Sequence, residues 1–146
     1  ESNDKFGRSL AAGDFNNDGF ADLVIGIPFD DIGGNSWGGS ILRLNGTPKG
    51  LTAADNLFLN ELYDINNTIL FGYAISVLDF NGDGFSDLVV GASNSSVNGT
   101  NKAGAVFTYT NLTNGTFSIN YQKWHQGGNG LADSVEAFDS FGEAFP

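Results

Sequence analysis

The chain has 146 residues, with 17 acidic and 6 basic side chains, a formal net charge of −11 and no cysteine. The lack of cysteine excludes disulfides, thiolate metal sites and iron–sulfur clusters. The acidic balance argues against nucleic acid or an anionic membrane as a partner. No apolar run approaches the roughly 18 residues that a membrane-inserted helix needs.

The first half of the chain contains four predicted strands. A short strand follows Phe6-Gly7 and ends at an acidic segment, residues 14–23. The unbroken apolar run at residues 23–27 is typical of a strand that is buried on both faces. A third strand is predicted at residues 39–44, and a weaker fourth near residues 56–62.

The second half repeats this order about 65 positions later. Phe71-Gly72 precedes an acidic segment at residues 79–88, which is followed by predicted strands at residues 88–92, 104–109 and, more weakly, 119–126. Four short strands in a unit of this size match one blade of a β-propeller, and the 21 glycines suit tight turns between them. The alternative is a β-sandwich with duplicated hairpins.

The two acidic segments have the pattern of a cation-binding loop. Each places a carboxylate or amide at positions 1, 3, 5 and 9, and a glycine at the bend at position 6. The residues are Asp14, Asn16, Asp18 and Asp22 in the first loop, and Asp79, Asn81, Asp83 and Asp87 in the second. Hard oxygen donors favour Ca²⁺, so two calcium sites are expected. The competing reading is that Asn-Asp-Gly and Gly-Asp-Gly simply make turns.

These loops are not EF-hands. The bidentate glutamate that an EF-hand carries at position 12 would fall on Ile25 and Val90, which have no side-chain oxygen.

Together, these sequence features resemble the FG-GAP repeats of integrin α-subunit propellers. The resemblance rests on Phe-Gly, the acidic loop, and then Gly26-Ile27-Pro28 and Gly91-Ala92-Ser93, where the family has Gly-Ala-Pro. Ser93 departs from that pattern. The resemblance implies that each loop joins the first two strands of a blade and binds a structural Ca²⁺. It also adds the carbonyl oxygens of Phe20 and Phe85 to the ligands.

The expected fold is therefore all-β, with about two four-stranded FG-GAP blades and the start of a third. Residues 1–146 form one repeat region, with blade 1 at about 6–70, blade 2 at about 71–140, and a further repeat starting at 141–146. A closed propeller needs about four to eight blades, so two blades are incomplete as a propeller. The chain is therefore expected either to be a piece of a longer polypeptide or to complete its core with other chains. The tail at residues 139–145 echoes residues 3–9. The tail of one copy could therefore take the opening-strand position of the next, giving head-to-tail assembly.

The expected function is noncatalytic. With one histidine, no cysteine and no Gly-X-Ser-X-Gly elbow, the familiar nucleophile constellations are missing. The resemblance implies a secreted or cell-surface module for adhesion or protein–protein assembly, with a protein or further copies of itself as partner. Asn94 and Asn98 begin sequons and are the candidate glycosylation sites.

Two alternatives stay open. One is a glycan-binding module, for which Trp37 on an exposed glycine-rich turn is a candidate contact. Trp124 is interpreted as an outer-strand aromatic that covers the blade, with a carbohydrate-stacking site at Trp124-His125 as the alternative. The other is a propeller domain of a larger secreted hydrolase or lyase, with catalysis elsewhere in that protein.

Overall fold

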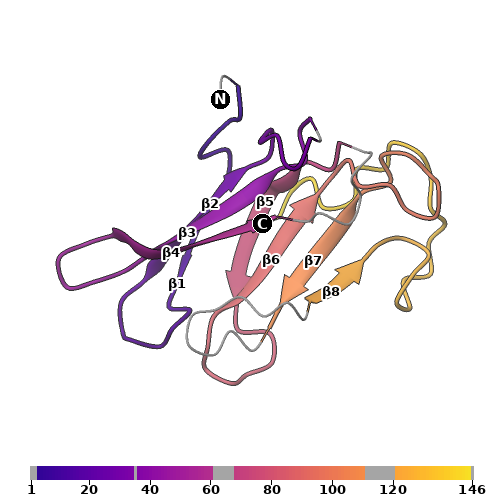
Figure 1. The fold of residues 1–146 in the computed structure, drawn as a ribbon. Coiled ribbons are helices and arrows are strands. Elements are labelled where there is room, and N and C mark those ends of the chain that lie inside the picture. Colours follow the sequence, from indigo (N-terminus) through magenta and orange to yellow (C-terminus); the bar gives the residue numbers. More distant parts are fainter. Residues whose placement is uncertain (1–2, 35, 61–67, 111–120, 146) are drawn as a thin grey trace.

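The computed structural model describes residues 3–34, 36–60, 68–110 and 121–145. These residues form two four-stranded antiparallel sheets (Figure 1), with strand orders β1-β2-β3-β4 and β5-β6-β7-β8. The described residues contain no helix, so none that could span a membrane. The all-β class with four strands per unit is confirmed.

The strands match the predicted order. The first sheet contains β1 (Leu10–Gly13), β2 (Asp22–Ile27), β3 (Ser40–Asn45) and β4 (Thr52–Asn60). The second contains β5 (Phe71–Leu78), β6 (Asp87–Ala92), β7 (Ala105–Tyr109) and β8 (Tyr121–Trp124). The predicted fourth strands extended to residues 61–62 and 119–120, which lie outside the described residues.

The apolar runs form the central strands of the sheets. Every residue of β6 is buried, and so is all of β2 except the half-buried Leu23. Strands covered on both faces have no need to alternate apolar with polar residues. This is why the sequence reads as continuous apolar runs here.

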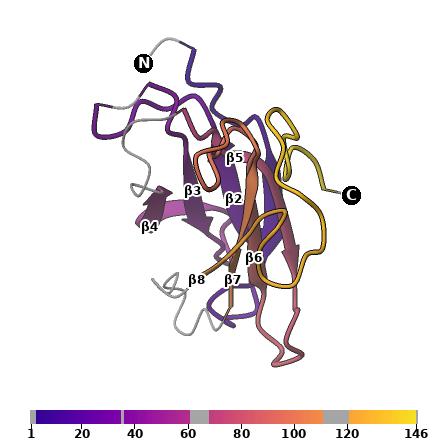
Figure 2. The same cartoon turned by 90° about the vertical axis from the view of Figure 1, so that its right-hand side faces the viewer.

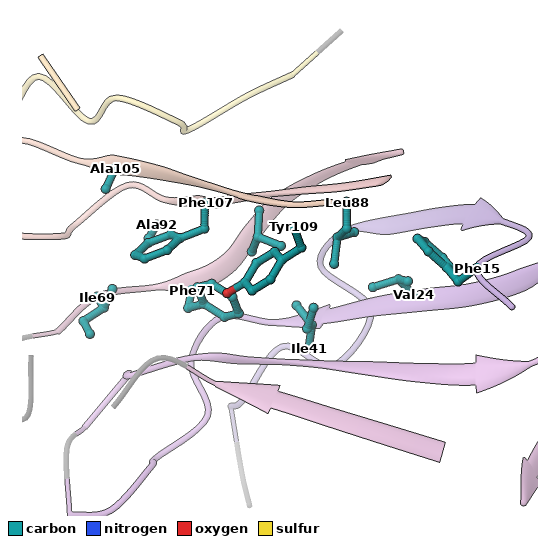
Figure 3. Packing of buried hydrophobic residues seen from close by; sticks show 11 residues of the cluster. Phe15, Val24, Ile41, Ile69, Phe71, Leu88, Ala92, Ala105, Phe107 and Tyr109 are labelled. Atoms are coloured by element: carbon teal, nitrogen blue, oxygen red, sulfur yellow. The ribbon is translucent and has the colours of Figure 1, made fainter. Parts of the chain in front are cut away.

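The core lies between the two sheets (Figure 3). Phe71 from β5 is fully buried and packs edge-on against Phe107 of β7, with ring centroids 5.5 Å apart. Val24 and Ile41 of the first sheet belong to the same cluster. Burying each of these side chains contributes about 2 kcal/mol, so the contact between the sheets is a large part of the stability of the fold.

Glycines make the joint between the sheets. A bridge pairs Gly39 with Phe71, and a Cβ added to Gly26 would collide with the carbonyl oxygen of Gly72. The Ser9 hydroxyl donates to that same carbonyl at 2.7 Å. The backbones therefore approach too closely for any side chain on Gly26.

The same joint occurs again at the end of the described chain. Gly104 pairs with Phe141 as Gly39 pairs with Phe71, and a Cβ on Gly91 would collide with the carbonyl oxygen of Gly142. The third Phe-Gly thus packs on the second sheet as the second Phe-Gly packs on the first. The blade boundaries at residues 70 and 140 stay a prediction.

Candidate metal-binding loops

Both acidic segments are hairpin loops at the same end of the molecule, the lower end in Figures 1 and 2. The first joins β1 to β2, where Gly13 pairs with Asp22, and the second joins β5 to β6, where Leu78 pairs with Asp87. The position-9 aspartate is therefore the first residue of a central strand in each sheet.

The first loop curls around the Asp14 carboxylate. Its two oxygens accept hydrogen bonds from the backbone N–H groups of Asp18 at 3.1 Å and Gly19 at 2.9 Å. Asp18 in turn accepts from the Phe20 N–H and from the Asn16 side-chain amide, both at 2.9 Å. Gly19 has φ +86°, a conformation that a side chain resists.

The second loop repeats this network. The Asp79 carboxylate accepts from the N–H groups of Asp83 at 3.1 Å and Gly84 at 2.9 Å. Asp83 accepts from the Phe85 N–H at 2.9 Å and from the Asn81 amide at 2.8 Å. The two loops are thus alike in geometry as well as in sequence.

The two position-9 aspartates are fully buried but differ in their partners. Asp22 accepts from the Gly46 N–H at 2.8 Å through Oδ1 and from the Phe15 N–H at 3.4 Å through Oδ2. Asp87 accepts from the Phe80 N–H at 2.8 Å through Oδ2, and its buried Oδ1 finds no hydrogen-bond partner in the described part of the chain.

The electrostatics of the second loop disfavour a bare carboxylate. Burial raises the pKa of Asp87, and the negative charges of Asp83 and Asp79 raise it further, while the backbone N–H groups of Phe80 and Asn81 lower it. A buried acid beside two other acids, only partly stabilised by backbone N–H groups, would be stabilised further by a positive charge nearby.

The first loop already has such a charge. Arg43 of β3 is buried, and burial lowers the pKa of its guanidinium while the negative charge of Asp22 opposes that effect. Arg43 pairs with Val24, and the matching pair in the second sheet is Thr108 with Val89. Arg43 was not among the residues predicted from the sequence, although a lone cation between Leu42 and Leu44 is the signal that could have pointed to it.

The described residues include no group of three or more acidic or histidine side chains gathered closely enough to hold a metal. The aspartates in the loops face backbone N–H groups instead. Even so, the donors are all oxygen atoms and one buried carboxylate oxygen lacks a partner, so the residue types fit a hard cation such as Ca²⁺. The loops therefore carry oxygen donors of the kind that a hard cation binds.

The other singled-out residues lie away from these loops. Trp37 is 50% exposed, has φ +62° and packs edge-on against Phe29, with ring centroids 5.5 Å apart. Trp124 is half-buried, as expected for an outer-strand aromatic. Asn98 is exposed and Asn94 half-buried, both between β6 and β7.

Comparison with known proteins identifies similar sequences. The family model described as FG-GAP repeat matches residues 6–42 and 71–109. Phosphatidylinositol-glycan-specific phospholipase D of Bos taurus is 33% identical over 118 residues, which cover 78% of this chain and 14% of that protein.

Integrin alpha-E of Mus musculus is 38% identical over 101 residues, covering 66% of this chain and 9% of that protein. Integrin alpha-5 of Xenopus laevis is 37% identical over 90 residues, covering 60% of this chain and 7% of that protein. The chain thus spans only a small part of the length of the curated relatives it matches.

Proposed function

Because the chain belongs to the FG-GAP repeat family, we propose that it is a noncatalytic, calcium-stabilised β-propeller module that works outside the cell in adhesion or protein–protein assembly. The observation that carries this proposal is the pair of acidic hairpin loops, which have the same ligand pattern and the same hydrogen-bond network in both sheets.

Each loop would hold one Ca²⁺ with oxygen ligands only. The first would use side chains of Asp14, Asn16, Asp18 and Asp22 with the Phe20 carbonyl, and the second those of Asp79, Asn81, Asp83 and Asp87 with the Phe85 carbonyl. When bound, the ion supplies positive charge that offsets the repulsion between the aspartates. Its role is structural, because it would fix the hairpin that starts each central strand.

Thermal unfolding of the chain in calcium and in excess EGTA tests this proposal. A site that binds only the folded state stabilises it by about 3 kcal/mol at a ligand concentration about 100 times Kd. We therefore expect a clear fall in melting temperature in EGTA, and isothermal titration calorimetry should count two sites. An Asp18→Ala, Asp83→Ala double variant is the matched control and should melt at the same temperature in both buffers. Equal melting of the unaltered chain in calcium and EGTA would refute the structural ions.

The proposed assembly runs head to tail. Phe141-Gly142 lies against the second sheet of its own chain in the manner of an opening strand. In such an assembly the tail would pair with β2 of the next copy in place of that copy's β1, whose Leu10 is 59% exposed. The interface would be heterologous, and it would close into a ring or run on as a filament.

The similarity to phospholipase D supports a second candidate, in which the chain is the propeller part of a larger secreted hydrolase. Catalysis would then lie in another part of that protein. A hydrolysis assay of the chain alone on a glycosylphosphatidylinositol substrate should show no turnover. The complete open reading frame would separate the candidates, because only the hydrolase reading requires a catalytic domain in the same polypeptide.

A further inference from the structure

A cavity of about 460 Å³ lies beside β8, the outermost strand of the second sheet, and is lined by Gln122, Lys123, Trp124 and Asn129. This volume falls in the range of about 300–1,000 Å³ that is typical of small-molecule sites. Tyr121 at the start of β8 pairs with Tyr109, which pairs with Leu88 beside the second acidic loop. Trp124, at the other end of the strand, is therefore distant from that loop. The cavity is thus separate from the metal-binding loops.

The tryptophan in this cavity is held in place. Its indole N–H donates to the Thr108 hydroxyl at 3.0 Å, and the side chain is only half-buried. Side chains alternate along a strand, so Gln122 and Trp124 share one face of β8. The cavity therefore places an amide beside a fixed aromatic ring.

The loop that follows β8 closes the other side. Two backbone hydrogen bonds shape this loop. The Gly128 N–H donates to the His125 carbonyl at 3.2 Å, and the Leu131 N–H donates to the Gly128 carbonyl at 2.9 Å. The Asn129 side-chain amide then donates to the Lys123 carbonyl, which ties the loop to the strand. A Cβ on Gly128 would collide with the His125 ring, so the loop packs closely on itself. This wall of the cavity is preformed, which reduces the entropy cost of binding.

A flat indole with carboxamides nearby suits a sugar ring. The C–H face of a pyranose packs on an aromatic surface, and a carboxamide can donate to one hydroxyl and accept from its neighbour. The Lys123 ammonium lies 5.5 Å from the Phe107 ring centroid, so its charge faces the core aromatic. The net charge of −11 also repels acidic sugars.

From this arrangement we propose that the cavity beside β8 binds a neutral pyranose of a glycan, with Trp124 as the stacking surface and Gln122 and Asn129 as hydroxyl partners. The site is independent of the calcium loops and of their role. It also places glycan contact at Trp124 and not at Trp37, which lies in the loop between β2 and β3 and lines none of this cavity.

The chain has only two tryptophans, which makes a direct test available. Trp37→Phe leaves Trp124 as the sole indole fluorophore, and Trp124→Phe leaves Trp37. Both variants are titrated, in calcium, with a panel of methyl pyranosides that includes glucose, galactose, mannose and N-acetylglucosamine forms and one uronic acid. We expect at least one neutral sugar to change the emission of Trp37→Phe saturably, and none to change that of Trp124→Phe.

Affinity for the responding sugar, measured by calorimetry, should fall at least about tenfold in Trp124→Phe and in Gln122→Ala. It should stay unchanged in Trp37→Phe. Gln122 is exposed, so its replacement leaves the fold intact, and a melting curve of each variant checks this. No response to any sugar, equal affinity in Trp124→Phe, or a response to the uronic acid alone would each overturn the proposal. The calcium dependence of melting is untouched by any of these results.

Discussion

Asp22 and Asp87 occupy the same position in their repeats, but their surroundings differ in charge. Asp22 interacts electrostatically with Arg43, and both of its oxygens accept backbone hydrogen bonds. At the place of Arg43 the second sheet has Thr108, which is neutral. We therefore expect the second loop to depend more strongly on a bound cation than the first.

Replacing each aspartate by asparagine tests this difference. In EGTA, Asp87→Asn should leave the free energy of unfolding unchanged or raise it by about 1 kcal/mol, because it removes a buried charge and its Oδ1 position has no donor to clash with. Asp22→Asn should lower it by about 1–3 kcal/mol, because the new NH₂ group would face a backbone N–H. Urea unfolding of both variants provides the measurement.

In calcium, Asp87→Asn should instead lower the free energy of unfolding relative to the unaltered chain, because the variant loses a ligand and with it most of the second ion's stabilisation. If Asp87→Asn is instead strongly destabilising in EGTA, the carboxylate has a folded-state role without the ion, and our account of the second loop is wrong.

At the scale of elements, the strands and their order were predictable because local sequence determines them. Continuous apolar runs predicted β2 and β6, and Phe-Gly followed by the acidic loop predicted the hairpins. The close approach of Gly26 to Gly72 was not predictable, since it depends on how the two sheets pack, which no local pattern encodes. The second sheet likewise has a neutral residue, Thr108, where the first has Arg43, and Thr108 lies 21 positions beyond Asp87 in the chain.

The glycine joint can be tested with two matched changes. Gly26→Ala places a methyl group against the Gly72 carbonyl inside the contact between the sheets. We expect it to lower the free energy of unfolding by about 3 kcal/mol, because the rigid backbone cannot move away without opening the core. Differential scanning calorimetry gives the change.

Gly91→Ala collides with the Gly142 carbonyl in the same way, but it meets no hydroxyl as Gly26→Ala meets Ser9, and only the segment after Ser140 has to move. Its effect should be clearly smaller than that of Gly26→Ala. Equal losses for the two variants would mean that the cost arises within the strands, and the joint would then have no special role.

At the scale of the whole molecule, equivalent residues are buried or exposed according to what lies beside them. Phe71 is fully buried against the first sheet, whereas Phe6 at the equivalent position is 64% exposed. Phe15 is fully buried and its counterpart Phe80 is 49% exposed. Exposed aromatics in matching places at both ends of the two-sheet unit suit interaction with another repeat.

Light scattering at increasing protein concentration, in calcium, tests head-to-tail assembly. We expect the mass to rise with concentration, and Phe141→Ser to shift the rise to at least about tenfold higher concentration, because Phe141 begins the segment that would cross to the next copy. Phe138→Ser is the control, since Phe138 is 71% exposed and lies outside the Phe-Gly joint. A monomer at every concentration, or equal effects of Phe141→Ser and Phe138→Ser, would refute the assembly proposal.

The repeated glycine joint has a consequence for how such chains change over evolutionary time. Gly26 meets Gly72, and Gly91 meets Gly142, through backbone atoms that every copy of the repeat carries. Duplication of one whole unit therefore creates a fitting boundary at once, with no compensating substitution in either neighbour. Gaining or losing whole repeats is then the least disruptive way for this architecture to change in length. A partial insertion would instead put a side chain where only glycine fits.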